Sequence, residues 1–151
     1  MKAQDMMTTD PACCTPESTA REAARLMRER DCGCIPVVEG KSRRLVGVVT
    51  DRDIACRCVA EGKGAETPVK EIMTKDPQCC HPEDDVAAIE QIMMQAMVRR
   101  VPVVDPKGNC LGMVAQADLA LTKAVGESEI GRVVERISEP GGSSLVPFRP
   151  A

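Results

Sequence analysis

The sequence has almost no aromatic residues. Its 151 positions include no Trp, no Tyr and a single Phe, at position 148. This excludes the aromatic stacking platforms on which single-stranded nucleic acids bind. The formal net charge is -3, which also argues against a broad basic face for phosphate backbones. We therefore expect no direct nucleic acid binding.

Long apolar runs are also missing. No stretch is long enough to span a membrane, and the start MKAQDMMTTD lacks the apolar core of a signal peptide. We expect a cytoplasmic protein without a membrane partner. With 43% hydrophobic and 28% charged residues, the chain fits one compact domain or two small ones that share a core.

Motifs of catalysis are absent. The sequence has one His, His81, and no nucleophile elbow, Walker loop or metalloprotease signature. We therefore expect no enzyme, no catalytic residues and no required cofactor.

The nine cysteines contain no CxxC pair, so the usual spacing of structural zinc sites is missing and we predict no metal site. Free Cys behaves as a small buried hydrophobe, so we expect most of the thiols to be reduced and buried. The doublets Cys13–Cys14 and Cys79–Cys80, the second followed by His81, keep a redox or metal sensor open as an alternative function.

An internal repeat is the most informative feature of the chain. MTTDPACCTPE from Met7 aligns with MTKDPQCCHPE from Met73, and IPVVEGK from Ile35 aligns with VPVVDPK from Val101. The octet GVVTDRDI, residues 47–54, returns as GMVAQADL, residues 112–119. Two copies of one unit of about 50 residues therefore fill most of the chain.

Each copy has the pattern of a short strand, a helix, two strands and a second helix. In the first copy the short strand is ACCT, the two later strands are IPVV and LVGVV, and the closing helix is TDRDIACRCVA. Apolar residues recur at helical spacing in the first helix of each copy: Ala20, Ala23, Ala24 and Met27, then Val86, Ile89, Ile92 and Met93. Neither copy could bury both faces of its sheet alone, so we predict that the two pack together.

These motifs, duplicated and in this order, resemble the cystathionine beta-synthase (CBS) domain family, as a stand-alone tandem pair or Bateman module, over residues 5–124. The resemblance implies an α/β (α+β) fold of two βαββα units packed by pseudo-twofold symmetry. It places CBS domain 1 at 5–62, CBS domain 2 at 69–125, and a C-terminal helix and flexible tail at 126–151. It implies regulatory binding of AMP, ADP, ATP, S-adenosylmethionine or a related adenosyl ligand in clefts between the units, without catalysis.

The first octet has two interpretations. Thr50 follows a strand and precedes a helix, so it can serve as the N-cap, with Asp53 in the acidic position of a capping box. A ligand could use the same helix start, with phosphate at free backbone amides near Thr50 and ribose hydroxyls at Asp53. The family's motif of Gly, two residues, Thr or Ser, two residues and Asp matches Gly47, Thr50 and Asp53.

In the second octet Asp118 is kept, but Ala115 replaces the Thr, which predicts a degraded or altered site. The resemblance also lines each cleft with the strand that carries PVV. The candidates are Ile35, Pro36 and Val37 beside Thr50, and Arg100, Val101 and Val103 beside Asp118. Arg99 and Arg100 either pair with phosphate oxygens or form a solvated pair at the strand entry.

Residues after the repeat form a further amphipathic segment. SEIGRVVERI places four apolar residues on one helical face: Ile130, Val133, Val134 and Ile137. This stripe packs on its own module, on a second copy or on a regulated protein. The family's disc-shaped dimers and an exposed stripe together predict a homodimer. A ligand-free structural dimerisation module is a further alternative.

Overall fold

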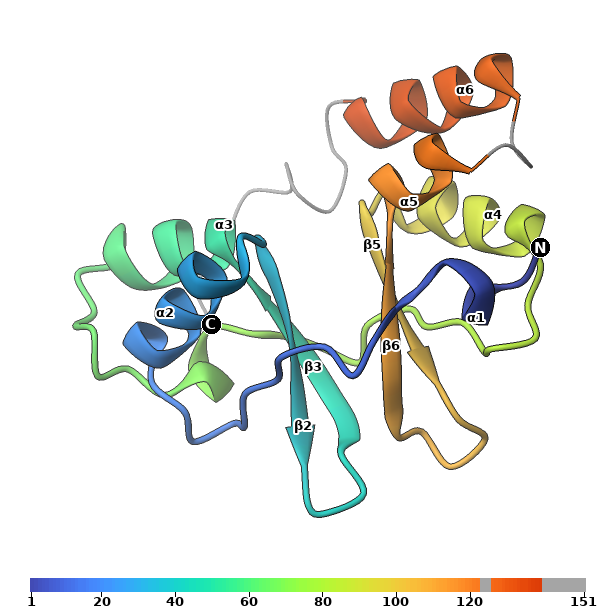
Figure 1. Ribbon diagram of the computed structural model, residues 1–151. Helices are drawn as coiled ribbons and strands as arrows, with labels where there is room; N and C mark the ends of the chain where they lie inside the picture. Colours follow the sequence, from blue (N-terminus) through green and yellow to red (C-terminus); the bar gives the residue numbers. More distant parts are fainter. Residues whose placement is uncertain (123–125, 140–151) are drawn as a thin grey trace. The chain divides into compact units, whose positions relative to one another are not determined.

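The computed structural model describes residues 1–122 and 126–139, and contacts divide the chain into two compact units (Figure 1). The repeat-1 unit comprises residues 11–77 and 108–110, and the repeat-2 unit comprises 1–10, 78–107 and the described residues from 111 onward. Residues 5–10 thus pack with the second repeat, although the sequence pattern placed them in the first CBS domain. The flexible tail predicted at the C-terminus lies, beyond residue 139, outside the described residues.

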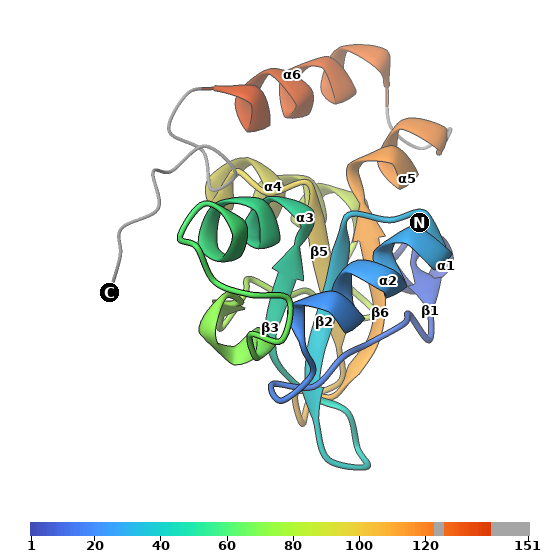
Figure 2. The same cartoon turned by 90° about the vertical axis from the view of Figure 1, so that its left-hand side faces the viewer.

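The repeat-1 unit contains a three-stranded antiparallel sheet in the order β2-β3-β4. A hairpin of β2 (Cys34–Glu39) and β3 (Arg44–Thr50) forms most of it, as the two β-branched runs predict, and β4 (Thr74–Lys75) adds a short edge. The helices are α2 (Ala20–Arg30), α3 (Asp51–Asp53) with a π-helical continuation over Ile54–Val59, and a 3-10 turn at Val69–Glu71. α2 lies across the hairpin in Figure 2.

The core of the repeat-1 unit lies between this hairpin and its helices. Ala20, Ala23 and Met27 of α2 are buried there, whereas Ala24 is exposed. The sheet and the segments after it contribute the other apolar residues of this core: Ile35, Val37, Val49, Cys58, Val69 and Ile72. The helical spacing therefore predicted three of the four apolar positions of α2 correctly.

The repeat-2 unit has the same plan. Its sheet has the order β1-β6-β5, with β1 (Thr8–Thr9), β6 (Cys110–Ala115) and β5 (Arg100–Val104). Its helices are α1 (Ala3–Met6), α4 (Val86–Ala96), α5 (Gln116–Leu121) and α6 (Glu127–Ser138). The buried apolar core combines strands β5 and β6 with α4, α5 and α6: Ile89, Met93, Val101, Val103, Val114, Leu119, Val133 and Ile137.

The short strands do not lie where the sequence placed them. The segment ACCT forms only an isolated bridge, between Cys14 and Val37. The opening strands are the MTTDP and MTKDP motifs, and each pairs with the hairpin of the other repeat. Thr74 pairs with Val48 in the repeat-1 sheet, and Thr8 pairs with Met113 in the repeat-2 sheet. A strand of two residues is too short to show the alternation of apolar and polar residues, so β1 and β4 can be recognised only by the strands with which they pair.

The first residue of each octet is Gly because the added strand runs directly against it. A Cβ on Gly47 would lie 2.7 Å from the backbone oxygen of Thr74, and one on Gly112 would lie 2.8 Å from that of Thr8. Neither neighbour is a flexible side chain, so it cannot move away without shifting the strand. The octet's Gly is thereby explained by sheet packing alone.

The apolar stripe of α6 packs on its own unit. Val133 and Ile137 are buried in the repeat-2 core, Ile130 is half-buried, and Val134 is 39% exposed. Of the three occupants considered for this stripe, the structure therefore supports the first. Because its own unit covers most of the stripe, the stripe is no evidence for a homodimer. The homodimer stays a prediction. Within the described ranges, no helix is both long and apolar enough to cross a membrane.

Candidate functional site

The first octet ends in a complete capping box. The Oγ1 atom of Thr50 accepts a hydrogen bond from the backbone N–H of Asp53 at 3.0 Å, and Oδ2 of Asp53 accepts one from the N–H of Thr50 at 2.9 Å. The capping interpretation is therefore confirmed. It does not exclude a ligand, because a hydroxyl that accepts a hydrogen bond still has a proton to donate.

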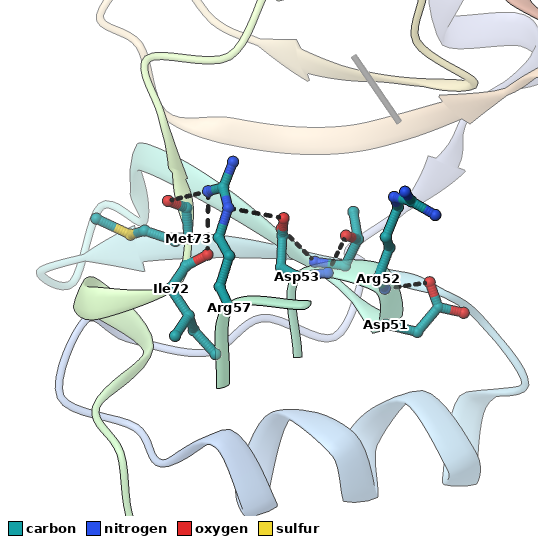
Figure 3. Close-up of polar contacts among 7 residues, drawn as sticks. Asp51, Arg52, Asp53, Arg57, Ile72 and Met73 are labelled. Carbon is teal, nitrogen blue, oxygen red and sulfur yellow. Dashed lines mark hydrogen bonds and ion pairs between the residues drawn. The ribbon is translucent and has the colours of Figure 1, made fainter. Parts of the chain in front are cut away.

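Asp53 is held on its other side by an arginine from the next helical turn (Figure 3). Nε of Arg57 lies 3.7 Å from Oδ1 of Asp53, and its Nη1 donates to the carbonyl oxygens of Ile72 at 3.3 Å and Met73 at 3.2 Å. Arg57 is not among the residues predicted for this site, although its spacing of four residues from Asp53 on a helix is a recognisable signal. Arg57 ties the octet helix to the segment that enters β4.

The carboxyl group of Asp53 lies in a largely dry environment. The residue is 9% exposed, and burial raises the pKa of the carboxyl above its ordinary value of 3.8. The N–H of Thr50 and the charge of Arg57 act in the opposite direction, since both stabilise the ionised form. A buried carboxylate fixed at a helix start is a directed acceptor for hydroxyl groups.

The backbone amides at this helix start are already hydrogen-bonded, contrary to the expectation of free amides. The N–H of Asp51 donates to the carbonyl of Gly33 at 3.0 Å, and the N–H of Arg52 donates to Oδ1 of Asp51 at 2.9 Å. The third amide, of Asp53, is taken by Thr50. A phosphate at this position would have to rely on side-chain donors, because the amides have no hydrogen to spare.

The second octet keeps the backbone arrangement without the hydroxyl. Oδ2 of Asp118 accepts from the N–H of Ala115 at 2.7 Å, and the N–H of Gln116 donates to the carbonyl of Arg99 at 2.8 Å, as Asp51 does to Gly33. The methyl group of Ala115 cannot accept a hydrogen bond from the N–H of Asp118, as the hydroxyl of Thr50 does from Asp53. The second site is thus a half-complete copy of the first, as its sequence indicates.

Strand alternation separates the predicted lining residues. The side chains of Ile35 and Val37, and likewise those of Val101 and Val103, are at most 1% exposed and belong to the two hydrophobic cores. Their side chains therefore pack in the cores, and only their backbone groups are left to line a cleft, so this part of the lining stays a prediction. Pro36 faces the opposite side of β2, since successive residues of a strand alternate, and it is buried as well. Arg100 opens β5 and is half-buried.

None of the nine cysteines forms a disulfide in the described structure; four are buried and five are half-buried. Within the described part of the chain, no three His, Cys, Asp or Glu residues are grouped to hold a metal ion. Sγ of Cys13 donates to the carbonyl of Pro11 at 3.2 Å and accepts from Nη2 of Arg43 at 2.8 Å. Cys13 is therefore a partly exposed thiol in direct contact with a guanidinium group.

We predict strongly unequal thiol reactivities in the native protein. Burial raises the pKa of the Cys14 and Cys80 thiols to about 12, so at pH 8 they should react with a disulfide reagent only as fast as the protein unfolds. Cys13 should react first. Cys13→Ser should remove the fast phase and Cys79→Ser, at the equivalent position of the second repeat, should not. A fast phase that survives Cys13→Ser would contradict this assignment.

The chain belongs to the CBS domain family: the sequence model of the CBS domain matches residues 3–58 and 69–122. The CBS domain-containing protein YhcV of Bacillus subtilis is 42% identical over 125 residues, which cover 83% of this chain and 87% of that protein. The fold is that of the CBS domain pairs, with mixed helix and strand content and two small antiparallel sheets.

Two solved structures are similar in fold and in sequence. Hypoxic Response Protein I with two coordinated zinc ions is 30% identical, with a TM-score of 0.73 over 80% of this chain and 97% of that one. The CBS domain pair of protein MJ0100, in complex with 5′-methylthioadenosine and S-adenosyl-L-methionine, is 25% identical, with a TM-score of 0.72 over 80% and 93%.

Proposed function

We propose that this protein is a regulatory module that binds an adenine nucleotide or a related adenosyl compound, with the ribose at Thr50 and Asp53. The observation that carries the proposal is the buried carboxylate of Asp53, fixed by Thr50 and Arg57 at the start of α3. The adenosyl compounds in the CBS domain pair of MJ0100 support the ligand class.

The groups of the capping box can still form hydrogen bonds with this ligand. Each oxygen of a carboxylate can accept about two hydrogen bonds. Oδ2 of Asp53 accepts one from Thr50, and Oδ1 faces Arg57 at 3.7 Å. Two ribose hydroxyls can therefore donate to Asp53 without breaking the cap. The hydroxyl of Thr50 can donate to a further ligand oxygen while it accepts from the amide of Asp53.

The hydrogen-bonded amides shape the ligand preference. Because the N–H groups of residues 51–53 already have acceptors, a phosphate adds little at the helix start beyond a bond to Thr50. The affinity should therefore depend more on the ribose hydroxyls than on the number of phosphates. Since Ala115 lacks the hydroxyl, we also propose that one ligand per chain binds well, at the first octet.

A ligand panel tests the proposal. We expect AMP, ADP, ATP, S-adenosylmethionine or 5′-methylthioadenosine to raise the melting temperature, by about 2.7 kcal/mol of added stability at a hundred times Kd. Calorimetry should give a stoichiometry near one per chain. The matched control is 2′-deoxy-AMP, which lacks one hydroxyl and should bind more weakly than AMP. If no compound stabilises the protein, or if the deoxy analogue binds equally well, the proposed site is wrong.

A further inference from the structure

A buried glutamate lies in the middle of α4, far along the chain from either octet. Glu90 is 9% exposed, and its Oε1 atom is buried with no hydrogen-bond partner in the described part of the chain. It is flanked in sequence by Ile89 and, one turn on, by Met93, both fully buried. Neither the fold nor the proposed ligand site requires a carboxyl group at this position.

The element that supplies charges to Glu90 is α6. This helix packs on α4 and contributes Val133 and Ile137 to the shared core. Two of its charged groups act on Glu90: the carboxylate of Glu129 and the guanidinium of Arg132, which lie 4.0 Å apart as an ion pair. β5 also packs against α4, and its charged residue is Arg100 at the first position of the strand.

This arrangement favours the neutral carboxyl group. Burial raises the pKa of Glu90 above its ordinary value of 4.5; the negative charge of Glu129 raises it further, and Arg132 lowers it. Ionisation with α6 in place leaves a negative charge near a second carboxylate, with the buried Oε1 atom lacking a hydrogen-bond donor among the described residues. When α6 moves away, water can reach Glu90 and solvate the ionised form.

We propose that α6 is a pH-responsive strap on the repeat-2 unit, closed while Glu90 is neutral and loosened when Glu90 ionises. The sign follows from linkage: the loosened state has the lower affinity for the proton, so the closed state loses stability as the pH rises. The loss begins near the ordinary glutamate pKa of 4.5 and ends at the raised value in the closed state. A loosened strap uncovers the apolar surface formed by Ile89 and Met93.

Hydrogen exchange of the α6 amides in the full-length chain tests the strap. After correction for the intrinsic exchange rate, protection of residues 127–138 should fall by up to tenfold per pH unit within this window. Glu90→Gln, which cannot ionise, should abolish the pH dependence and exchange more slowly than wild type at pH 8. The matched control is Glu135→Gln, an exposed acid of α6 that is not among the groups acting on Glu90, so this variant should keep the wild-type pH dependence. The amides of α2 in the other unit serve as an internal standard.

Two further variants keep the proposal testable if Glu90→Gln does not fold. Glu129→Gln removes a repulsion, so the pH midpoint of α6 loosening should move down, and Arg132→Gln removes an attraction, so it should move up. Protection that is independent of pH in wild type would overturn the strap. So would an equal pH dependence in Glu90→Gln, or midpoints of the other two variants that do not move in opposite directions.

Discussion

Replacing Asp53 by Asn should remove most of the adenosyl ligand affinity and leave the protein folded. Hydrogen bonds to a charged group contribute roughly 1.5–3 kcal/mol each, so losing a charged acceptor for two ribose hydroxyls should weaken binding by about two to four orders of magnitude. The amide oxygen of Asn can still accept from the N–H of Thr50, which preserves the cap. Calorimetry with the tightest ligand of the panel measures the loss, and thermal unfolding checks the fold.

The equivalent change in the second octet is the control. Asp118→Asn should leave the affinity of the first site unchanged. The wild-type affinity should also fall as the pH is lowered through the pKa of Asp53, starting at a higher pH than for an ordinary aspartate, because burial raises that pKa. Asp53→Asn should abolish this dependence. If Asp53→Asn lowers only the melting temperature and binds ligand as wild type does, the octet serves as a helix cap alone.

Gly47→Ala should destabilise the repeat-1 unit by about 1–3 kcal/mol, the usual penalty for inserting a methyl group into a packed region. The added Cβ would sit 2.7 Å from the carbonyl oxygen of Thr74, so β4 must move or separate from β3. Urea unfolding followed by circular dichroism measures the effect, since the chain has no Trp or Tyr to report by fluorescence.

Alanine substitutions at two other glycines serve as comparisons. Gly112→Ala should be similarly costly, because its Cβ would lie 2.8 Å from the carbonyl oxygen of Thr8. Gly64→Ala is the matched control, since a Cβ there meets no atom within 4 Å. Equal stabilities of Gly47→Ala and Gly64→Ala would show that the close approach of β4 does not determine the octet's first residue.

The internal repeat and the periodicity of the sequence predicted the number of units, the main strands and the capping box. The duplicated motifs indicated two similar units, the β-branched runs marked both hairpins, and the spacing of Thr50 and Asp53 predicted the capping box. Helical spacing also identified the buried apolar positions of α2 and α4, although it included Ala24, which is exposed. Each of these signals is local: it depends on residues a few positions apart, whose relation is set by backbone geometry alone.

What the sequence did not reveal depends on contacts between distant segments. IPVV is apolar at every position, so it does not tell that the side chains of Ile35 and Val37 are the ones that face the core. The carbonyl of Gly33, which occupies the amide of Asp51, carries no side-chain signal. The buried position of Glu90 was equally unexpected, because a single acid within an apolar helix usually faces solvent.

The exchange of the two short strands also determines when the protein can fold during synthesis. Thr8 and its partner Met113 are separated by about a hundred residues, so β1 must wait for nearly the whole chain before it can pair. β4 is made shortly after β3, by contrast, and can join it early. Pairings between distant residues are slow to form because the loop must close first. On the ribosome, the repeat-1 sheet should therefore be complete first, while β1 stays unpaired until β6 emerges.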